Sequence, residues 1–190
     1  MEFLNALIGK ETDCGCFYNR EEKLSNYDYR NDSFFIDARE LIKGCIDDYK
    51  DIKGITMKDF FIIQMHYMLL WSVIERFCSF KYGYFNIGGN KFNFANESVF
   101  INILKNIERE DKVFSSDKLE LYKLDSDDCE ESIGYYYTIR CNVVHKGKTV
   151  KEEDKIKLKL SLEELFRLFE GVYKDTLNQN NQELERFEGY

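Results

Sequence analysis

One short stretch of the chain, Arg140-Cys-Asn-Val-Val-His145, places an arginine five residues before one of two histidines. A guanidinium group binds phosphate oxygens through paired hydrogen bonds and stabilises negative charge that develops in a transition state. Imidazole takes up and releases a proton near neutral pH. Together the two residue types suit chemistry on a phosphate ester, although the spacing alone is a weak signal.

The residues around Arg140 strengthen the signal. Apolar and aromatic residues recur at helical spacing and put Arg140 on the inward stripe of its helix; they are Ile133, Tyr136, Tyr137 and Val144. A charge there needs an anionic partner, because an unpaired buried charge is costly. We expect Glu75 to be an ion-pair partner that orients Arg140. The alternative is that Glu75 is a helix-surface residue paired with Ser79 or Lys81.

Lysines follow the histidine directly. Lys146-Gly147 predicts a helix end, which puts His145 in the last turn, where the helix dipole favours a cation. Seven cations and three acids lie between Arg140 and Lys159. Within this patch Lys146, Lys148 and Lys151 are the candidate RNA contacts, and a solvated charged face is the alternative. Residues five apart point about 140° from each other on an ideal helix. Arg140 and His145 therefore converge best at a frayed helix end or across a dimer axis.

Other reactive residue types are better explained as structural. Cys14-Gly-Cys16 lacks a second Cys or His pair, so we expect no metal site. We expect His66 to be a hydrogen-bonded core residue rather than a catalytic one. Tyr135, Tyr136 and Tyr137 are candidates for stacking on RNA bases, but at least two of them fit the core or a dimer interface better.

Hydrophobic periodicity predicts the helices that must position these residues, at about 33–51, 56–82, 96–108, 127–145 and 161–177. Thr56 with Asp59 predicts the start of the second helix, and Ser161 with Glu164 predicts a capping box for the fifth. Tyr84–Phe94 is either a small β-hairpin insertion or an irregular aromatic loop. The expected fold is an all-α bundle of about five helices. Residues 1–190 form one domain, with an arm at 1–32, a bundle core at 33–177 and a frayed tail at 178–190.

Composition limits the classes of function. The net charge is −8 and the chain has no proline, which suits long helices and gives no global attraction to nucleic acid or membrane. The longest apolar run, 60–74, is interrupted by polar residues and is too short to span a bilayer. We expect no signal peptide, no membrane association, and a reducing cytoplasmic setting for the six cysteines.

The segment Tyr137-Thr-Ile-Arg-Cys-Asn-Val-Val-His-Lys-Gly147 resembles the signature of the HEPN superfamily, small helical bundles that carry an Arg-x4–6-His motif. The motif proper covers about a dozen residues, and the general layout covers about 33–177. The resemblance implies a metal-independent endoribonuclease without a cofactor. It also implies a homodimer formed through the motif helix, so that the Arg and His of two copies line one cleft.

By the same resemblance, Arg140 stabilises phosphorane charge and His145 acts as general acid or base, with Asn142 and Glu75 in support. The setting implied is RNA degradation in a stress response or antiviral (phage) defence, as a toxin with a cognate inhibitor or regulatory protein. The alternative is a non-catalytic HEPN module that binds RNA, a nucleotide or a protein. Cys141 departs from the family pattern, because many members place a polar residue directly after the arginine. Gly147 stands where some members carry a tyrosine that becomes adenylylated.

Overall fold

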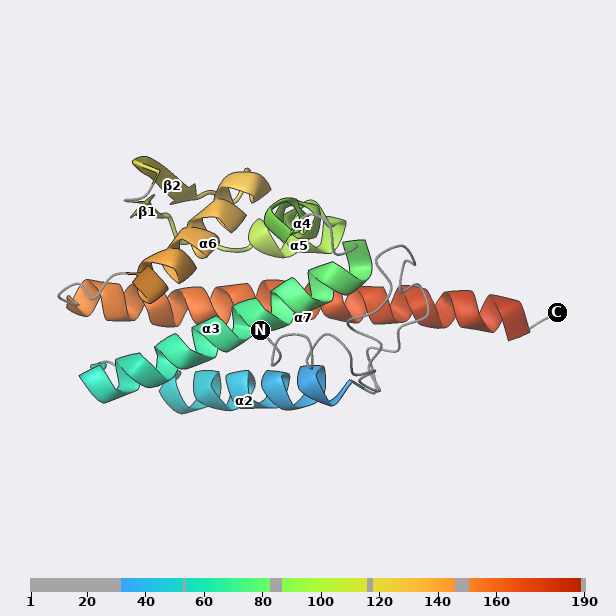
Figure 1. The fold of residues 1–190 in the computed structure, drawn as a ribbon, viewed down its shortest axis with the longest axis horizontal. Coiled ribbons are helices and arrows are strands. Elements are labelled where there is room, and N and C mark those ends of the chain that lie inside the picture. The colour runs from blue at the N-terminus through green and yellow to red at the C-terminus, as the bar shows by residue number, and fades with distance from the viewer. Residues whose placement is uncertain (1–31, 53, 83–86, 116–117, 146–150, 189–190) are drawn as a thin grey trace, which may run out of the picture.

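The computed structural model describes residues 32–52, 54–82, 87–115, 118–145 and 151–188 (Figure 1). Within these ranges the chain forms six α-helices and one antiparallel hairpin, so the expected mostly helical bundle is confirmed. The elements are α2 (Ser33–Tyr49), α3 (Met57–Tyr82), α4 (Ile87–Ala95), α5 (Ser98–Leu104), β1 (Asp111–Ser115), β2 (Glu120–Leu124), α6 (Cys129–His145) and α7 (Glu152–Glu188). The predicted arm, including Cys14 and Cys16, lies outside the described residues apart from Asp32.

Side-chain caps explain where the first two helices begin. The Asp32 carboxylate accepts the N–H of Phe34 at 2.8 Å and so caps α2. At α3, Thr56 Oγ1 accepts the Asp59 N–H at 3.2 Å, and the Asp59 carboxylate accepts the Thr56 N–H at 3.0 Å. This reciprocal pair is the capping arrangement that the sequence predicts. Ten residues of α3 are buried, as expected for a central helix of a bundle.

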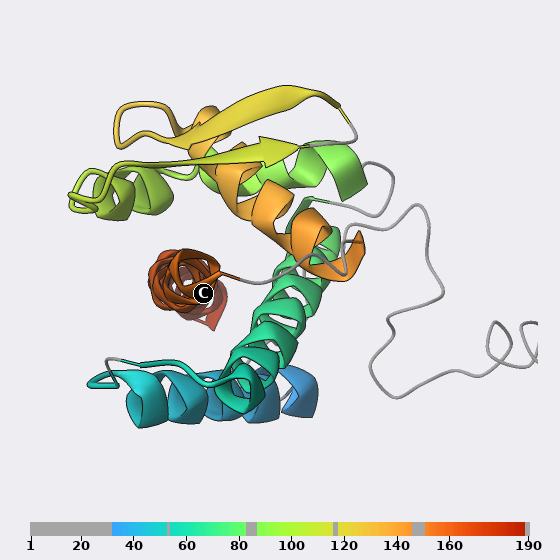
Figure 2. The ribbon, with the colours of Figure 1, turned by 90° about the vertical axis from the view of Figure 1, so that its left-hand side faces the viewer.

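Helix α7 lies at the centre of the molecule. Figure 2 looks along it and shows α2, α3, α5 and the hairpin arranged around it. The helix predicted over 161–177 is present but extends further at both ends, because α7 runs unbroken over 37 residues. Ser161 is fully buried inside this helix and caps nothing. The alternation of lysines and apolar residues over 155–162 hid the helical period. Leu158 and Leu162 are buried in the core, while Lys155 and Lys157 donate to the backbone carbonyls of neighbouring segments.

The β-hairpin is real but lies elsewhere in the chain than predicted. Residues 87–95 of the predicted hairpin segment form α4, which buries Asn90, Phe94 and Ala95 on one side. The two strands instead pair Asp111 with Leu124 and Ser115 with Glu120 at their ends. Inward and outward residues alternate along β1, as a half-covered hairpin requires. Charged residues on the outer face of both strands obscured this pattern in the sequence.

The hairpin packs closely on α6. At Gly134 an added Cβ would lie 2.6 Å from the Tyr122 ring of β2, so this helix position must lack a side chain. The third predicted helix, 96–108, is shorter than expected: α5 ends at Leu104, and Ile107 is buried after the helix has ended. None of the helices that the structure describes is long and apolar enough to cross a lipid bilayer.

Candidate functional site

Helix α6 carries the Arg140–His145 segment and ends at His145, as predicted. Asp128 accepts the N–H of Glu131 at 2.9 Å and caps its first turn. Three fully buried residues, Ile133, Tyr135 and Tyr136, hold its inner face in the core. At the other end, the Gln64 side chain of α3 donates to the Val143 carbonyl at 3.2 Å and so satisfies one of the open carbonyls of the last turn.

Arg140 lies where α6 approaches α3. Its Nη2 is 3.5 Å from Glu75 Oε1, so the ion pair predicted from the sequence is present. The guanidinium carbon is 5.5 Å from the centroid of the Tyr137 ring, and a quarter of the side chain is exposed. Its Nε is buried without a hydrogen-bond partner among the described residues. Arg140 is therefore oriented by Glu75, while its Nε donor remains unused among the described residues.

The other half-buried arginines in the described ranges behave differently. Arg39 donates twice to Glu170, Arg76 donates twice to Asp32, and Arg109 donates twice to Glu164. Paired donors of this kind are the usual way for a protein to neutralise a half-buried arginine. Among these described side chains, Arg140 alone makes no hydrogen bond to a carboxylate. Its Nε therefore remains available to donate to an additional anion.

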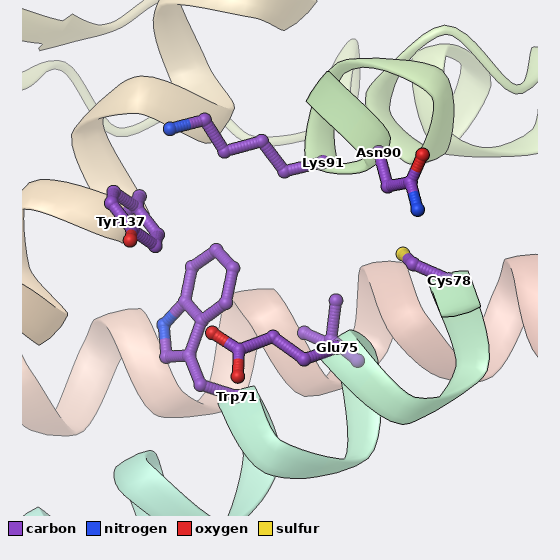
Figure 3. A pocket seen from close by; sticks show the side chains of 7 residues that line it. Trp71, Glu75, Cys78, Asn90, Lys91 and Tyr137 are labelled. Atoms are coloured by element: carbon purple, nitrogen blue, oxygen red, sulfur yellow. The ribbon is translucent and has the colours of Figure 1, made fainter. Parts of the chain in front are cut away.

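A pocket of about 60 Å³ opens beside the Arg140–Glu75 pair, between α3, α4 and α6 (Figure 3). Trp71 and Tyr137 meet edge to face with their ring centroids 5.3 Å apart. Lys91 reaches from α4 over the Tyr137 ring, with its Nζ 3.8 Å from the ring centroid. Glu75 points into the space between α3 and α6, and Cys78 and Asn90 lie near each other at the other end.

The charges around this pocket influence one another. Burial lowers the pKa of Lys91, and the nearby positive charge of Lys118 lowers this pKa further. Burial also raises the pKa of Tyr137, which keeps its ring neutral beside the two cations. Lys91 thus shares the Tyr137 ring with Arg140 and is close enough to Lys118 for repulsion.

The remaining predicted site residues have mixed outcomes. Asn142 donates its side-chain N–H to the Phe114 carbonyl at 3.1 Å, which ties α6 to β1. The side chain of His145 and all of Lys146 and Lys148 lie outside the described residues. Lys151 is exposed just before α7, and its backbone N–H is accepted by Asp154 at 3.0 Å.

Three lysines of the predicted basic patch are engaged within the fold. Lys155, Lys157 and Lys159 donate to the backbone carbonyls of Ile55, Lys112 and Lys50, respectively. Each also lies within ion-pair distance of a carboxylate; the carboxylates belong to Glu152, Asp111 and Glu163. These lysines connect α7 to its neighbours through hydrogen bonds and ion pairs.

Several other predicted roles can be compared with the structure. His66 Nδ1 donates a hydrogen bond to the Ile62 carbonyl oxygen, 2.7 Å away, in agreement with a structural role, although the side chain is only partly buried. Tyr135 and Tyr136 are buried in the core, as expected for two of the three tyrosines. In the described ranges, no group of three or more His, Cys, Asp or Glu side chains gathers closely enough to hold a metal ion.

The sequence interpretation missed Trp71 and Lys91. Trp71, Glu75 and Cys78 lie at i, i+4 and i+7 on α3, so their helical spacing was a signal that they share a face. No comparable signal exists for Lys91, because only the packing of α4 on α6 brings it to Tyr137.

The fold and this geometry define a helical-bundle protein with an aromatic pocket. Beside the pocket lie Lys91, Glu75 and Arg140, whose Nε has no hydrogen-bond partner among the described residues. No protein-family model matches the chain, and no curated protein or solved structure matches it either.

Proposed function

We propose that the chain is a HEPN-type, metal-independent endoribonuclease that acts as a homodimer in RNA degradation, in a stress response or antiviral defence. Support comes from the resemblance of residues 137–147 to the HEPN motif and from the helical bundle that carries this segment. The biological setting rests on the resemblance alone.

The observation that carries the proposal is the state of Arg140. It is held by one ion pair of 3.5 Å to Glu75, and its Nε has no hydrogen-bond partner among the described residues. An arginine with free donors at the edge of a pocket can bind the non-bridging oxygens of a phosphodiester. The carboxylate of Glu75 fixes the direction of the guanidinium without taking up its hydrogen bonds.

The reaction requires one proton to be removed and one to be delivered. The ribose 2′-hydroxyl attacks the adjacent phosphorus and gives its proton to a base. The bond from phosphorus to the 5′-oxygen breaks, and that oxygen receives a proton, which leaves a 2′,3′-cyclic phosphate and a 5′-hydroxyl. In the proposal Arg140 stabilises the phosphorane charge, and His145 of the two copies provides general acid and base.

The test is cleavage of single-stranded RNA in the presence of EDTA by the purified full chain. We expect Arg140→Ala and His145→Ala each to lower the rate by about 10²–10⁴-fold, since each removes a transition-state interaction. Arg167→Ala on the exposed side of α7 is the matched control and keeps the wild-type rate. Urea unfolding must show that the inactive variants remain folded, and the new ends must be a cyclic phosphate and a 5′-hydroxyl.

A non-catalytic HEPN module is the second candidate. Asn142 supports it, because its side chain already donates to Phe114 and Cys141 offers little polarity beside Arg140. This candidate would be favoured over the ribonuclease if the wild-type dimer binds RNA without ever cleaving it and if Arg140→Ala weakens that binding.

A further inference from the structure

Two cations from separate elements meet at one aromatic ring of α6. Lys91 of α4 and Arg140 of α6 both lie on the Tyr137 ring, 3.8 Å and 5.5 Å from its centroid. Lys118, an exposed residue in the turn between β1 and β2, adds positive charge that lowers the pKa of Lys91. Among the described residues, Glu75 is the acid that pairs with Arg140, and no carboxylate pairs with Lys91. The cluster therefore carries an excess of positive charge.

Like charges that are brought together in a half-buried place destabilise a fold unless an anion binds there. Elsewhere in the described chain, half-buried cations are paired: Arg39 with Glu170, Arg109 with Glu164 and Lys81 with Glu97. Lys91 departs from this pattern, because no carboxylate pairs with it among the described residues, and Arg140 beside it has only the 3.5 Å pair with Glu75. No anionic partner for Lys91 lies among the described residues, and an anion bound from solution would supply one.

The size of the pocket limits what the partner places inside it. A cavity that holds benzene has a volume of about 150 Å³, whereas this pocket measures about 60 Å³. A nucleobase is thus too large to enter completely, but the oxygens of a tetrahedral anion are not. The partly exposed Tyr137 ring at the same pocket offers apolar surface to a sugar or base outside it, whereas Trp71 is buried.

We propose that Lys91 and Arg140 form a phosphate-binding site at the mouth of the pocket that Trp71 and Tyr137 line, with the exposed Lys118 as an additional positive charge. The shared ligand chemistry is a phosphate group, which belongs either to an RNA backbone or to a free nucleotide. The assignment of this phosphate to RNA rests on the proposed function. The anion site itself rests only on the positions and charges of the cations. Lys91 and Lys118 supply point charges, and Arg140 supplies the directional donors.

Trp71 is the single tryptophan of the sequence and lines this pocket, so its fluorescence reports on binding there. The full-length chain is titrated with inorganic phosphate, with adenosine monophosphate and with a mixed-sequence oligonucleotide made of 2′-O-methyl RNA, which cannot be cleaved. We expect the Trp71 fluorescence to change and saturate with each ligand, and the oligonucleotide to bind most tightly. A mononucleotide that binds as tightly as the oligonucleotide would identify a nucleotide site and overturn the assignment to RNA.

We compare the oligonucleotide affinity of two charge-removing variants, Lys91→Gln and Lys118→Gln, at several salt concentrations. The controls are Lys91→Arg, which keeps the charge, and Lys43→Gln on the exposed face of α2. Each charge-removing variant should weaken oligonucleotide binding roughly tenfold. Each should also lower the slope of log Kd against log salt concentration by about 0.7, the value for one phosphate contact on a single strand. Lys91→Arg restores most of the affinity, and Lys43→Gln leaves affinity and slope unchanged.

The outcomes separate this proposal from the ribonuclease. If Lys91→Gln and Lys118→Gln bind with wild-type affinity and slope while the wild type cleaves RNA, the phosphate site is refuted and the ribonuclease stands. If Lys91→Gln loses the Trp71 response while the wild type never cleaves RNA, the site stands and the ribonuclease is refuted. Absence of any response to all three ligands refutes the site.

Discussion

A single guanidinium, that of Arg109, links the hairpin, α6 and α7. It donates to both carboxylate oxygens of Glu164, at 2.8 and 2.6 Å, and to Asp111 at 2.5 Å. It also reaches the hydroxyls of Tyr135 and Ser161, at 3.1 and 3.3 Å. All these groups are at least three-quarters buried. Arg109 and Arg140 thus differ in role because of their partners, although their exposures are similar.

This network predicts a large cost when one partner alone is removed. Arg109→Met leaves the Glu164 carboxylate half-buried without its cation, so we expect a loss of about 3 kcal/mol in the free energy of unfolding. Removing both charges, in Arg109→Met with Glu164→Leu, should cost less than the sum of the two single changes. Urea unfolding of the four proteins measures this coupling, and strict additivity would contradict it.

At this scale the sequence predicted one contact of the site and missed another. The Glu75–Arg140 pair was predictable, because an inward arginine requires an acid and α3 offered one. The contact between Lys91 and Tyr137 was not, since nothing local to either residue indicates it. Ser161 and Glu164 show the opposite error: their spacing matches a helix cap, but both face Arg109 instead. Short motifs of this kind have several structural solutions.

At the scale of elements, helix starts with side-chain caps were predictable and the hairpin was not. Thr56 and Asp59 fix the start of α3 through local hydrogen bonds that their spacing predicted, and Asp32 caps α2 in the same local way. The hairpin owes its place to contact with α6, at Gly134 and Tyr122. A two-stranded sheet is marginal in isolation, so its location depends on tertiary packing that no local pattern encodes.

The contact at Gly134 predicts opposite effects for two glycine substitutions. In Gly134→Ala the new Cβ would meet the Tyr122 ring at 2.6 Å, and displacement of the hairpin should cost about 1–3 kcal/mol. Gly44→Ala in α2 has open space and should gain about 0.5–1 kcal/mol from better helix propensity. Thermal and urea unfolding give both values. Equal gains for the two variants would show that the hairpin does not pack on α6 in this way.

At the scale of the whole molecule, stability depends on acids that are ionised in the folded state. Burial alone would raise the pKa of Asp111, but hydrogen bonds from Lys157, from the Lys112 N–H and from Tyr135 outweigh it and lower this pKa. For Glu170, likewise, bonds from Arg39 outweigh burial and lower the pKa. A lowered folded-state pKa contributes stability above the unfolded-state pKa, near 4, and this stability is lost as the pH falls.

We therefore expect the free energy of unfolding to vary little between about pH 7 and 5 and to fall steeply below about pH 4. Asp111→Asn should be less stable than wild type at neutral pH and should decline less steeply in acid, because its side chain cannot take up the proton. Asp47→Asn, on the exposed face of α2, is the control and should follow the wild-type curve. Unfolding monitored by circular dichroism over this pH range measures the slopes, and parallel curves for wild type and Asp111→Asn would refute the assignment.

The position of α7 also has a kinetic consequence. It follows every other described element in the chain, yet it lies at their centre and contacts α2, α3, α5 and α6. Lys155 and Lys159 reach carbonyls that are 100 and 109 residues earlier in the chain. Contacts of such separation slow folding, because a long loop must close before they form. During synthesis, the apolar surface of α3 that α7 covers stays exposed until α7 has left the ribosome. We therefore expect the nascent chain to be more prone to aggregation than the folded, acidic protein.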